Sequence, residues 1–188
     1  MTDSIIQFPV KPEKFQAHDS KKKELLDAIN NTTLVEKIFG PNNDITRCDW
    51  GPGRFDPNRE WLKVLQFDLN EHLKNWMKQF KYETFTIHEI WFQQYATGGK
   101  HSWHVHGCNF TSVYFLDLPG ETPVTQWIDP VTGNAHNFNV QEGDIITFPS
   151  WTVHRAPINQ TKEIKTIISW NMDVDISDFY KATDEQSY

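Results

Sequence analysis

The chain has 188 residues, which is enough for one domain with a full hydrophobic core and short for two. Aromatic residues make up 14% of it, with 8 Trp and 13 Phe, which excludes a disordered chain and favours a β-rich core or an aromatic-lined pocket. The formal net charge of -7 argues against nucleic acid as a partner, because a phosphate backbone requires clustered Lys and Arg.

Cysteine content and hydropathy indicate the cellular compartment of the protein. Cys48 and Cys108 are too few for a disulfide framework. No apolar signal region follows Met1, and no apolar run is long enough to span a bilayer. We therefore expect a soluble cytoplasmic protein without a membrane partner.

Residues 1–82 are expected to form an N-terminal arm and supporting helices. Prolines in residues 1–18 favour an edge strand over Ile5–Phe8 or an arm laid over the body. A short helix is expected to begin at Asp19 or Ser20. The run Thr33–Glu36 resembles a capping box, which predicts another helical turn that ends at Gly40–Pro41.

The Gly and Pro residues between 40 and 58 predict a long loop. After it, Asp56 as N-cap and Pro57 at the first helical position predict the strongest helix, which extends to about Tyr82. Its apolar residues recur at three- and four-residue spacing, which is far more typical of packing on a sheet than of a ligand groove. These residues are Trp61, Leu65, Leu69, Leu73, Trp76, Met77 and Phe80.

Residues 83–172 are predicted to form about eight short strands. Turns are expected at Gly98–Gly99, Pro119–Gly120 and Glu142–Asp144, and 129–133 is expected to be a hairpin loop. Helices followed by many strands favour a mainly β fold of the α+β type, a double-stranded β-helix (jelly roll) with the helices packed on one sheet. We expect a single domain over 1–188, with 173–188 as a frayed tail.

Three histidines are candidate metal ligands. Residues i and i+2 of a strand point to the same face, so His104 and His106 can converge on one atom, whereas His101 should face away. His154 follows the apolar run Ile145–Phe148. A lone histidine in a strand is usually structural, but three that converge in a wet pocket normally indicate a metal.

Residues 86–172 resemble the 2-oxoglutarate/Fe(II)-dependent oxygenases related to prolyl hydroxylases. The resemblance covers nearly half the chain, keeps the strand order and is most specific at Phe148–Pro149–Ser150–Trp151 followed by His154. The other matching stretches are 91–95, 102–106, 111–116, 129–130, 143–147 and 165–171.

The resemblance implies Fe(II), 2-oxoglutarate and O₂ as cofactor and cosubstrates, with His104, His106 and His154 as iron ligands. Lys165 stands where these oxygenases keep a basic residue that pairs with the distal carboxylate of 2-oxoglutarate, since an unpaired buried anion would be costly. Arg155 is a weaker substitute, and Lys162 lies in a polar turn where solvation is the default.

Further pocket residues follow from the same resemblance. Tyr114 is a candidate hydroxyl donor to the cosubstrate and Asn171 a candidate lining residue, although plain packing explains each equally well. Trp103, Trp127 and Trp151 are expected to line the substrate pocket and shield the oxidant from water.

One position departs from the pattern of the wider superfamily, which has Asp or Glu where this chain has His106. A neutral imidazole there leaves the metal site one unit more positive and is expected to alter O₂ activation. Asp117, on the next strand, is an alternative ligand, although it reads better as a strand-end residue; Asp144 lies in a turn.

Other functions stay open on the sequence alone. The spacing also fits parts of the two cupin motifs, so a three-His oxidase that does not use 2-oxoglutarate is one alternative. A non-catalytic jelly roll that binds a partner is another. For the oxygenase, the substrate is expected to be a protein side chain or a small molecule, and a homodimer through the aromatic N-terminal half is a further option.

Overall fold

The computed structural model describes residues 8–80 and 82–175. Its elements are three helices and eleven strands within these ranges, none of the helices being long and apolar enough to cross a membrane. The helices are α1 (His18–Asn31), α2 (Trp50–Gly53) and α3 (Glu60–Lys78). The strands are β1 (Pro12–Lys14), β2 (Glu36–Phe39), β3 (Asn43–Cys48), β4 (Phe85–Tyr95), β5 (Lys100–His104), β6 (Phe110–Asp117), β7 (Gln126–Ile128), β8 (Ala135–Asn137), β9 (Asp144–Pro149), β10 (His154–Ala156) and β11 (Lys165–Val174).

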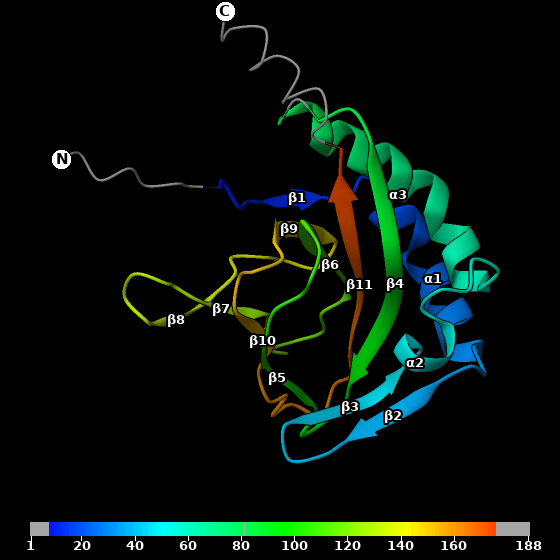
Figure 1. Cartoon of the computed structure of the whole chain (residues 1–188). Helices are drawn as coiled ribbons and strands as arrows, with labels where there is room; N and C mark the ends of the chain where they lie inside the picture. The colour runs from blue at the N-terminus through cyan, green and yellow to red at the C-terminus, as the bar shows by residue number, and fades with distance from the viewer. Residues whose placement is uncertain (1–7, 81, 176–188) are drawn as a thin grey trace, which may run out of the picture.

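The strands form one curled antiparallel sheet with the order β1-β9-β6-β11-β4-β3-β5-β10-β7-β8, and β2 pairs with β3 off this path. The two long helices cover one face of the β9-β6-β11-β4 part (Figure 1). The short strands β5, β10 and β7 curl round opposite the other face. This is the double-stranded β-helix with helices packed on one sheet that the sequence predicted.

The long strands are buried on both faces, and their alternation separates two cores. In β11, the even-numbered residues Ile168, Trp170 and Met172 pack toward α1 and α3, whereas Ile167 packs with Phe115 of β6 inside the curl. Because both faces are covered, these strands are almost continuously buried, although they include polar residues. The alternation therefore decides which side chains can reach the interior of the roll.

Helix α3 forms where the apolar stripe predicted one, and its buried residues face the sheet. Its start was predicted wrongly. The helix begins at Glu60, with Arg59 as N-cap, because the Asp56 side chain accepts a hydrogen bond from the Asn58 backbone N–H (2.8 Å) and closes a turn before the helix.

The segment 33–58 also differs from the prediction. Residues 36–39 form β2 instead of a helical turn, because Ile38 pairs with Ile45 of β3 and the Glu36 carboxylate accepts a hydrogen bond from the Gly51 backbone N–H. The predicted long loop contains β3 and α2. In both places tertiary pairing overrides the local signal.

Two predictions about the ends of the chain are only partly testable. Residues 5–7 of the expected edge strand lie outside the described residues; the strand in this region is β1, which pairs with β9. The expected tail from 173 was placed too early, since β11 continues to Val174, and residues 176–188 lie outside the described part.

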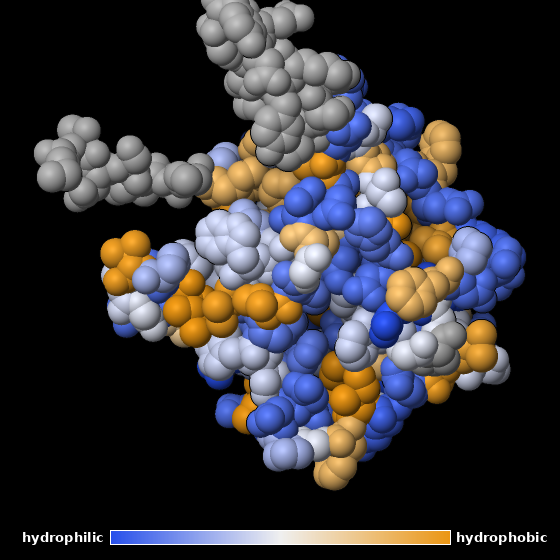
Figure 2. Space-filling view, viewed as in Figure 1, coloured by the Kyte–Doolittle hydropathy of each residue, from blue (hydrophilic) through white to orange (hydrophobic). Residues whose placement is uncertain are grey.

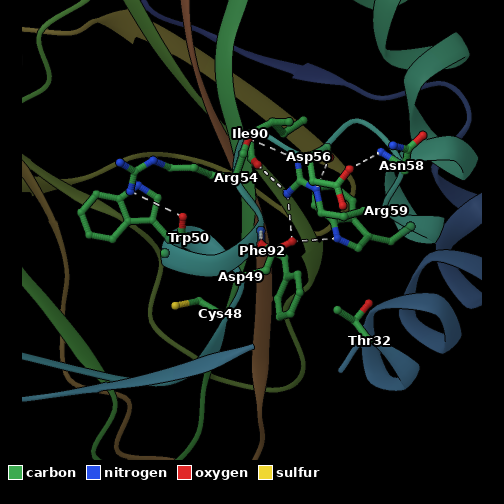
Figure 3. Close-up of polar contacts among 12 residues, drawn as sticks. Thr32, Cys48, Asp49, Trp50, Arg54, Asp56, Asn58, Arg59, Ile90 and Phe92 are labelled. Carbon is green, nitrogen blue, oxygen red and sulfur yellow. Dashed lines mark hydrogen bonds and ion pairs between the residues drawn. The ribbon is translucent and has the colours of Figure 1, made fainter. Parts of the chain in front are cut away.

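A buried ion pair joins α3 to the sheet (Figure 3). Asp49 is fully buried, and its Oδ2 accepts hydrogen bonds from Arg59 Nη1 (2.9 Å) and Trp61 Nε1 (3.0 Å). Its Oδ1 accepts one from the Phe92 backbone N–H of β4 (2.9 Å), and Arg59 also donates to the Ile90 carbonyl (2.7 Å). Every partner is satisfied, so the pair fixes the 49–59 segment and the start of α3 against β4.

Removal of the Asp49 carboxylate should therefore be strongly destabilising. Asp49→Ala leaves the Arg59 cation buried without an anion, and we expect the free energy of unfolding to fall by about 3–5 kcal/mol. Urea denaturation measures this loss. The exposed pair of Lys23 and Asp27 supplies the control, since Asp27→Ala should leave the free energy of unfolding nearly unchanged. Equal effects of the two variants would contradict the assignment.

Candidate metal centre

The curl of the sheet brings three imidazoles together. His104 ends β5 and pairs directly with His154 of β10, so both side chains lie on the inner face. The backbone N–H of His106 donates to the Ser150 carbonyl (2.9 Å), which holds the chain after β5 against the turn before β10. The nitrogen atoms that His104, His106 and His154 offer as ligands lie within 4.8 Å of one another.

Backbone carbonyls orient two of the rings. Nδ1 of His104 lies 2.6 Å from the Ser102 carbonyl, and Nδ1 of His154 lies 2.8 Å from the Thr152 carbonyl. A carbonyl can only accept, so Nδ1 carries the proton in each ring and Nε2 keeps its lone pair. This second contact fixes the tautomer that metal-ligating histidines use.

The environment keeps the imidazoles neutral. Burial lowers the pKa of His104, and burial together with the neighbouring imidazoles lowers the pKa of His106 to about 4 and of His154 to about 2. Neutral imidazole is the form that binds divalent transition metals. Within the described residues, the carboxylate of Asp117 binds Lys22 near α1 (2.7 Å) and does not join the group.

His101 lies in the same pocket, against the expectation that it faces away. Its ring stacks on His104 with 4.0 Å between centroids. The reason is a β-bulge: His104 pairs with His154 but His101 pairs with Ala156, so β5 has one residue more than β10 between the two pairs. The extra residue reverses the alternation.

The space beside the imidazoles is small, with a volume of about 30 Å³. It can accommodate an ion with one or two water molecules. Its walls come from β4, β6, β11 and the strands that carry the histidines, and they include Trp91, Gln93, Tyr95, Thr111, Val113, Thr125, Ile167 and Ser169.

Lys165 is the first residue of β11 and is fully buried. Its Nζ donates to the Pro123 carbonyl (2.7 Å) and lies 4.9 Å from the centre of the Tyr95 ring. Burial lowers its pKa to about 7, because no carboxylate offsets the lost hydration. The Tyr95 hydroxyl is also buried and has no hydrogen-bond partner within the described residues. The Lys165 ammonium and the Tyr95 hydroxyl are both hydrogen-bond donors that a carboxylate ligand could accept from.

The other predicted residues lie in three different places. Tyr114 is on the helix-facing side of β6, where its hydroxyl contacts His18 Nδ1 (2.7 Å), so it points away from the imidazoles. Asn171 is on the inner side, where it donates to Glu89 (2.6 Å) and accepts from Thr111 (3.0 Å). Arg155 lines the metal pocket and lies over the Trp103 ring, with 4.4 Å from Cζ to the ring centroid.

Trp127 and Trp151 line a separate, larger cleft of about 460 Å³. Its walls include the turn that leads to His154, so it adjoins the metal pocket through the backbone.

Several inner-face residues were not singled out from the sequence. Tyr95 and Trp91 belong to a matching stretch but had no assigned role. The indole N–H of Trp91 is buried without a partner among residues 8–80 and 82–175, and its ring centroid lies 6.2 Å from that of His106. Counting alternate residues back from Tyr95 along β4 would have placed both beside the histidines.

Comparisons with known proteins connect this geometry to a fold. No family model matches the chain, and no curated protein matches it. Solved structures do. A viral collagen prolyl hydroxylase from Paramecium Bursaria Chlorella virus-1, in its 2OG complex, aligns with a TM-score of 0.62 and 14% identity over 87% of this chain and 94% of that one.

Two further prolyl hydroxylases align as well. One is the Pseudomonas putida prolyl-4-hydroxylase, with a TM-score of 0.63 and 14% identity over 86% of this chain and 91% of that one. The other, from Trichoplax adhaerens in complex with a peptide fragment, has a TM-score of 0.64 and 13% identity over 87% and 82%. This chain therefore has the double-stranded β-helix fold of the prolyl hydroxylases and other 2OG-Fe(II) oxygenases.

Proposed function

We propose that this protein is a non-haem Fe(II)- and 2-oxoglutarate-dependent oxygenase that hydroxylates a protein side chain or a small molecule. The carrying observation is the inner face of the roll. It holds three neutral imidazoles that converge and, on the same face, a buried lysine without an anion. The fold shared with 2OG-Fe(II) oxygenases supports this combination.

In this proposal the histidines hold the metal, and their neighbours orient them and exclude water. Nε2 of His104 and of His154 and a ring nitrogen of His106 hold the metal, while the Ser102 and Thr152 carbonyls keep two of the rings oriented. Iron with 2-oxoglutarate and O₂ supplies the oxidation of a C–H bond. Trp91, buried beside His106, keeps water from that side.

The Lys165 ammonium and the Tyr95 hydroxyl hold the distal carboxylate of 2-oxoglutarate. The present cavity of about 30 Å³ is too small for a five-carbon dicarboxylate, so binding requires the inner side chains to move apart. Lys165 then exchanges the Pro123 carbonyl for the carboxylate, a stronger, charge-assisted partner.

The small cavity and the third imidazole favour a second candidate, a three-His metal oxidase that does not use 2-oxoglutarate. The two candidates share the metal centre and differ only at Lys165. Experiments on 2-oxoglutarate therefore discriminate between them.

The metal centre is tested by titration of the purified protein with Co(II), an optical substitute for Fe(II), and by elemental analysis. One equivalent of metal is expected to bind. His154→Ala removes a ligand and should weaken binding on the order of 100-fold or more. His88→Ala removes an exposed histidine paired with Asp173 and should have no effect. Unchanged binding by the His154 variant would rule out the site.

Binding of 2-oxoglutarate should depend on pH through Lys165. The ammonium binds the carboxylate, and its pKa in the free protein is about 7, so the cation is present below pH 7 and is lost above it. Affinity should fall by up to about tenfold per pH unit above pH 7, with uptake of one proton. Calorimetry of the metal-loaded protein in buffers of different ionisation enthalpy measures both. Lys165→Arg stays charged and should remove the dependence.

Turnover is the third test. With Fe(II) and O₂, the protein should convert 2-oxoglutarate to succinate even without its substrate. Lys165→Ala should abolish this conversion while circular dichroism shows a folded protein, and Lys162→Ala, at an exposed turn, should match the unmodified protein. Stoichiometric metal binding with neither succinate nor any heat of 2-oxoglutarate binding would favour the second candidate.

A further inference from the structure

The two ends of the curled sheet face each other across the cleft of about 460 Å³. The strand path ends at β1 on one side and at β8 on the other, and the cleft lies between them. Its floor comes from β9 and from the turn before His154. The lining residues are Phe8, Val10, Pro12, Trp127, Ile128, Pro130, Asn137, Phe138, Asn139, Ile146, Pro149, Trp151, Thr152 and Val153.

The lining of this cleft carries no charge. None of the residues just named is Lys, Arg, His, Asp or Glu, although charged residues make up 23% of the sequence. Its polar groups are the side chains of Asn137, Asn139 and Thr152, the indole N–H groups of Trp127 and Trp151, and the backbone. A charged occupant would lose hydration here without gaining a partner, so the occupant is neutral.

Aromatic rings dominate the accessible part of the cleft. Trp151 is 65% exposed, which is unusual for so large an apolar side chain. Trp127 stacks with Phe138 at 6.1 Å between centroids. Figure 2 shows hydrophobic surface over the β7–β8 hairpin at this side of the molecule. Val131, in the loop of this hairpin, is 90% exposed. Tryptophan platforms of this kind are frequent anchors for polypeptide partners.

The backbone at one side of the cleft has free hydrogen-bonding groups. β8 pairs with β7 on one edge, and within the described residues no strand pairs with its other edge, where Ala135–Asn137 are all exposed. At the opposite side, Pro12 leaves β1 without one N–H donor. β8 contains no proline, so it is the edge that can accept another strand.

From these observations we propose that the cleft binds an extended, uncharged polypeptide segment, which adds to β8 as a strand and rests its apolar side chains on Trp127 and Trp151. Strand addition supplies backbone hydrogen bonds, and the ring-lined walls select the side chains. The same wall carries the third imidazole, because Trp127 pairs with His154 and the Ile128 N–H donates to the Val153 carbonyl (2.9 Å). The segment therefore lies against the backbone of the metal centre, and its binding does not require metal.

The test is a selection of random dodecapeptides displayed on phage against the immobilised full-length, metal-free protein. Enriched peptides, synthesised with neutral ends, are then measured by tryptophan fluorescence and calorimetry. We expect them to be rich in aliphatic and aromatic residues and to lack Asp, Glu, Lys and Arg. Trp151→Ala and the charge-inserting Asn139→Asp should each weaken binding at least tenfold. Both residues are exposed, so the variants should keep the unfolding temperature of the parent.

Controls separate this mode of binding from others. Phe67→Ala removes an aromatic side chain of similar exposure (73%) on α3 and should leave the affinity unchanged. N-methylation of alternate peptide nitrogens in one register should abolish binding, and in the other register it should not, because only one edge of the added strand faces β8.

Four results would overturn the proposal. The first two are selection of charged peptides or of none, and Trp151→Ala and Asn139→Asp variants that bind the peptide as tightly as the parent protein. The others are peptide binding that is unaffected by N-methylation in both registers, and an unmodified protein that is dimeric and becomes monomeric with Trp151→Ala. Indifference to N-methylation together with displacement of the peptide by the neutral dye Nile red would assign the cleft to small apolar molecules. A dimer that depends on Trp151 would assign it to a second copy of the chain. Loss of metal binding or of 2-oxoglutarate turnover would not affect the outcome.

Discussion

The alternation of side chains along β11 is the constraint on which the rest of the structure depends. This strand lies between β4 and β6 with both faces covered, so each of its buried residues belongs either to the helix-packed core or to the interior of the roll. Trp170 anchors the first, while Ser169 lines the second and Lys165, four residues earlier on the same face, lies over the Tyr95 ring. A shift of one residue would exchange the two sets, placing a lysine under the helices and an indole beside the three imidazoles.

The two buried cations Arg59 and Lys165 differ in their partners, and this difference indicates a structural role for one and a ligand-binding role for the other. Arg59 has a complete set of partners, with Asp49 as its counterion, and this arrangement holds the segment 49–59 to the sheet. Lys165 is equally buried, but in the described part of the chain its ammonium has one carbonyl and no anion as partner. A satisfied ion pair is explained by the fold, whereas an unpaired cation at the end of a strand that also lines the metal pocket calls for a ligand.

The metal pocket and the cleft share a wall, the turn at 149–153 and the β7–β10 pair. Within this wall His154 faces the other imidazoles, while its direct partner Trp127, on the same face of the β7–β10 pair, lines the adjoining cleft together with Trp151 of the turn. Because the sheet is curled but its first and last strands are not joined, the gap between β1 and β8 gives access at this wall. The open end of the roll thus places a cleft lined by uncharged residues next to the three converging imidazoles.

The sequence by itself determined the strand-rich half, the long amphipathic helix and the three histidines, because these features depend on local periodicity and on a short motif. Only the tertiary structure decided the remainder. Residues 36–39 became a strand through pairing with β3, the bulge in β5 turned His101 inward, and the helix-facing register of β6 directed Tyr114 to His18. Lys165 was placed by resemblance, but its lack of a counterion, like the partnerless Tyr95 hydroxyl, follows from which distant residues surround it. Pairing, bulges and burial are interactions between segments far apart in the chain, and no local pattern encodes them.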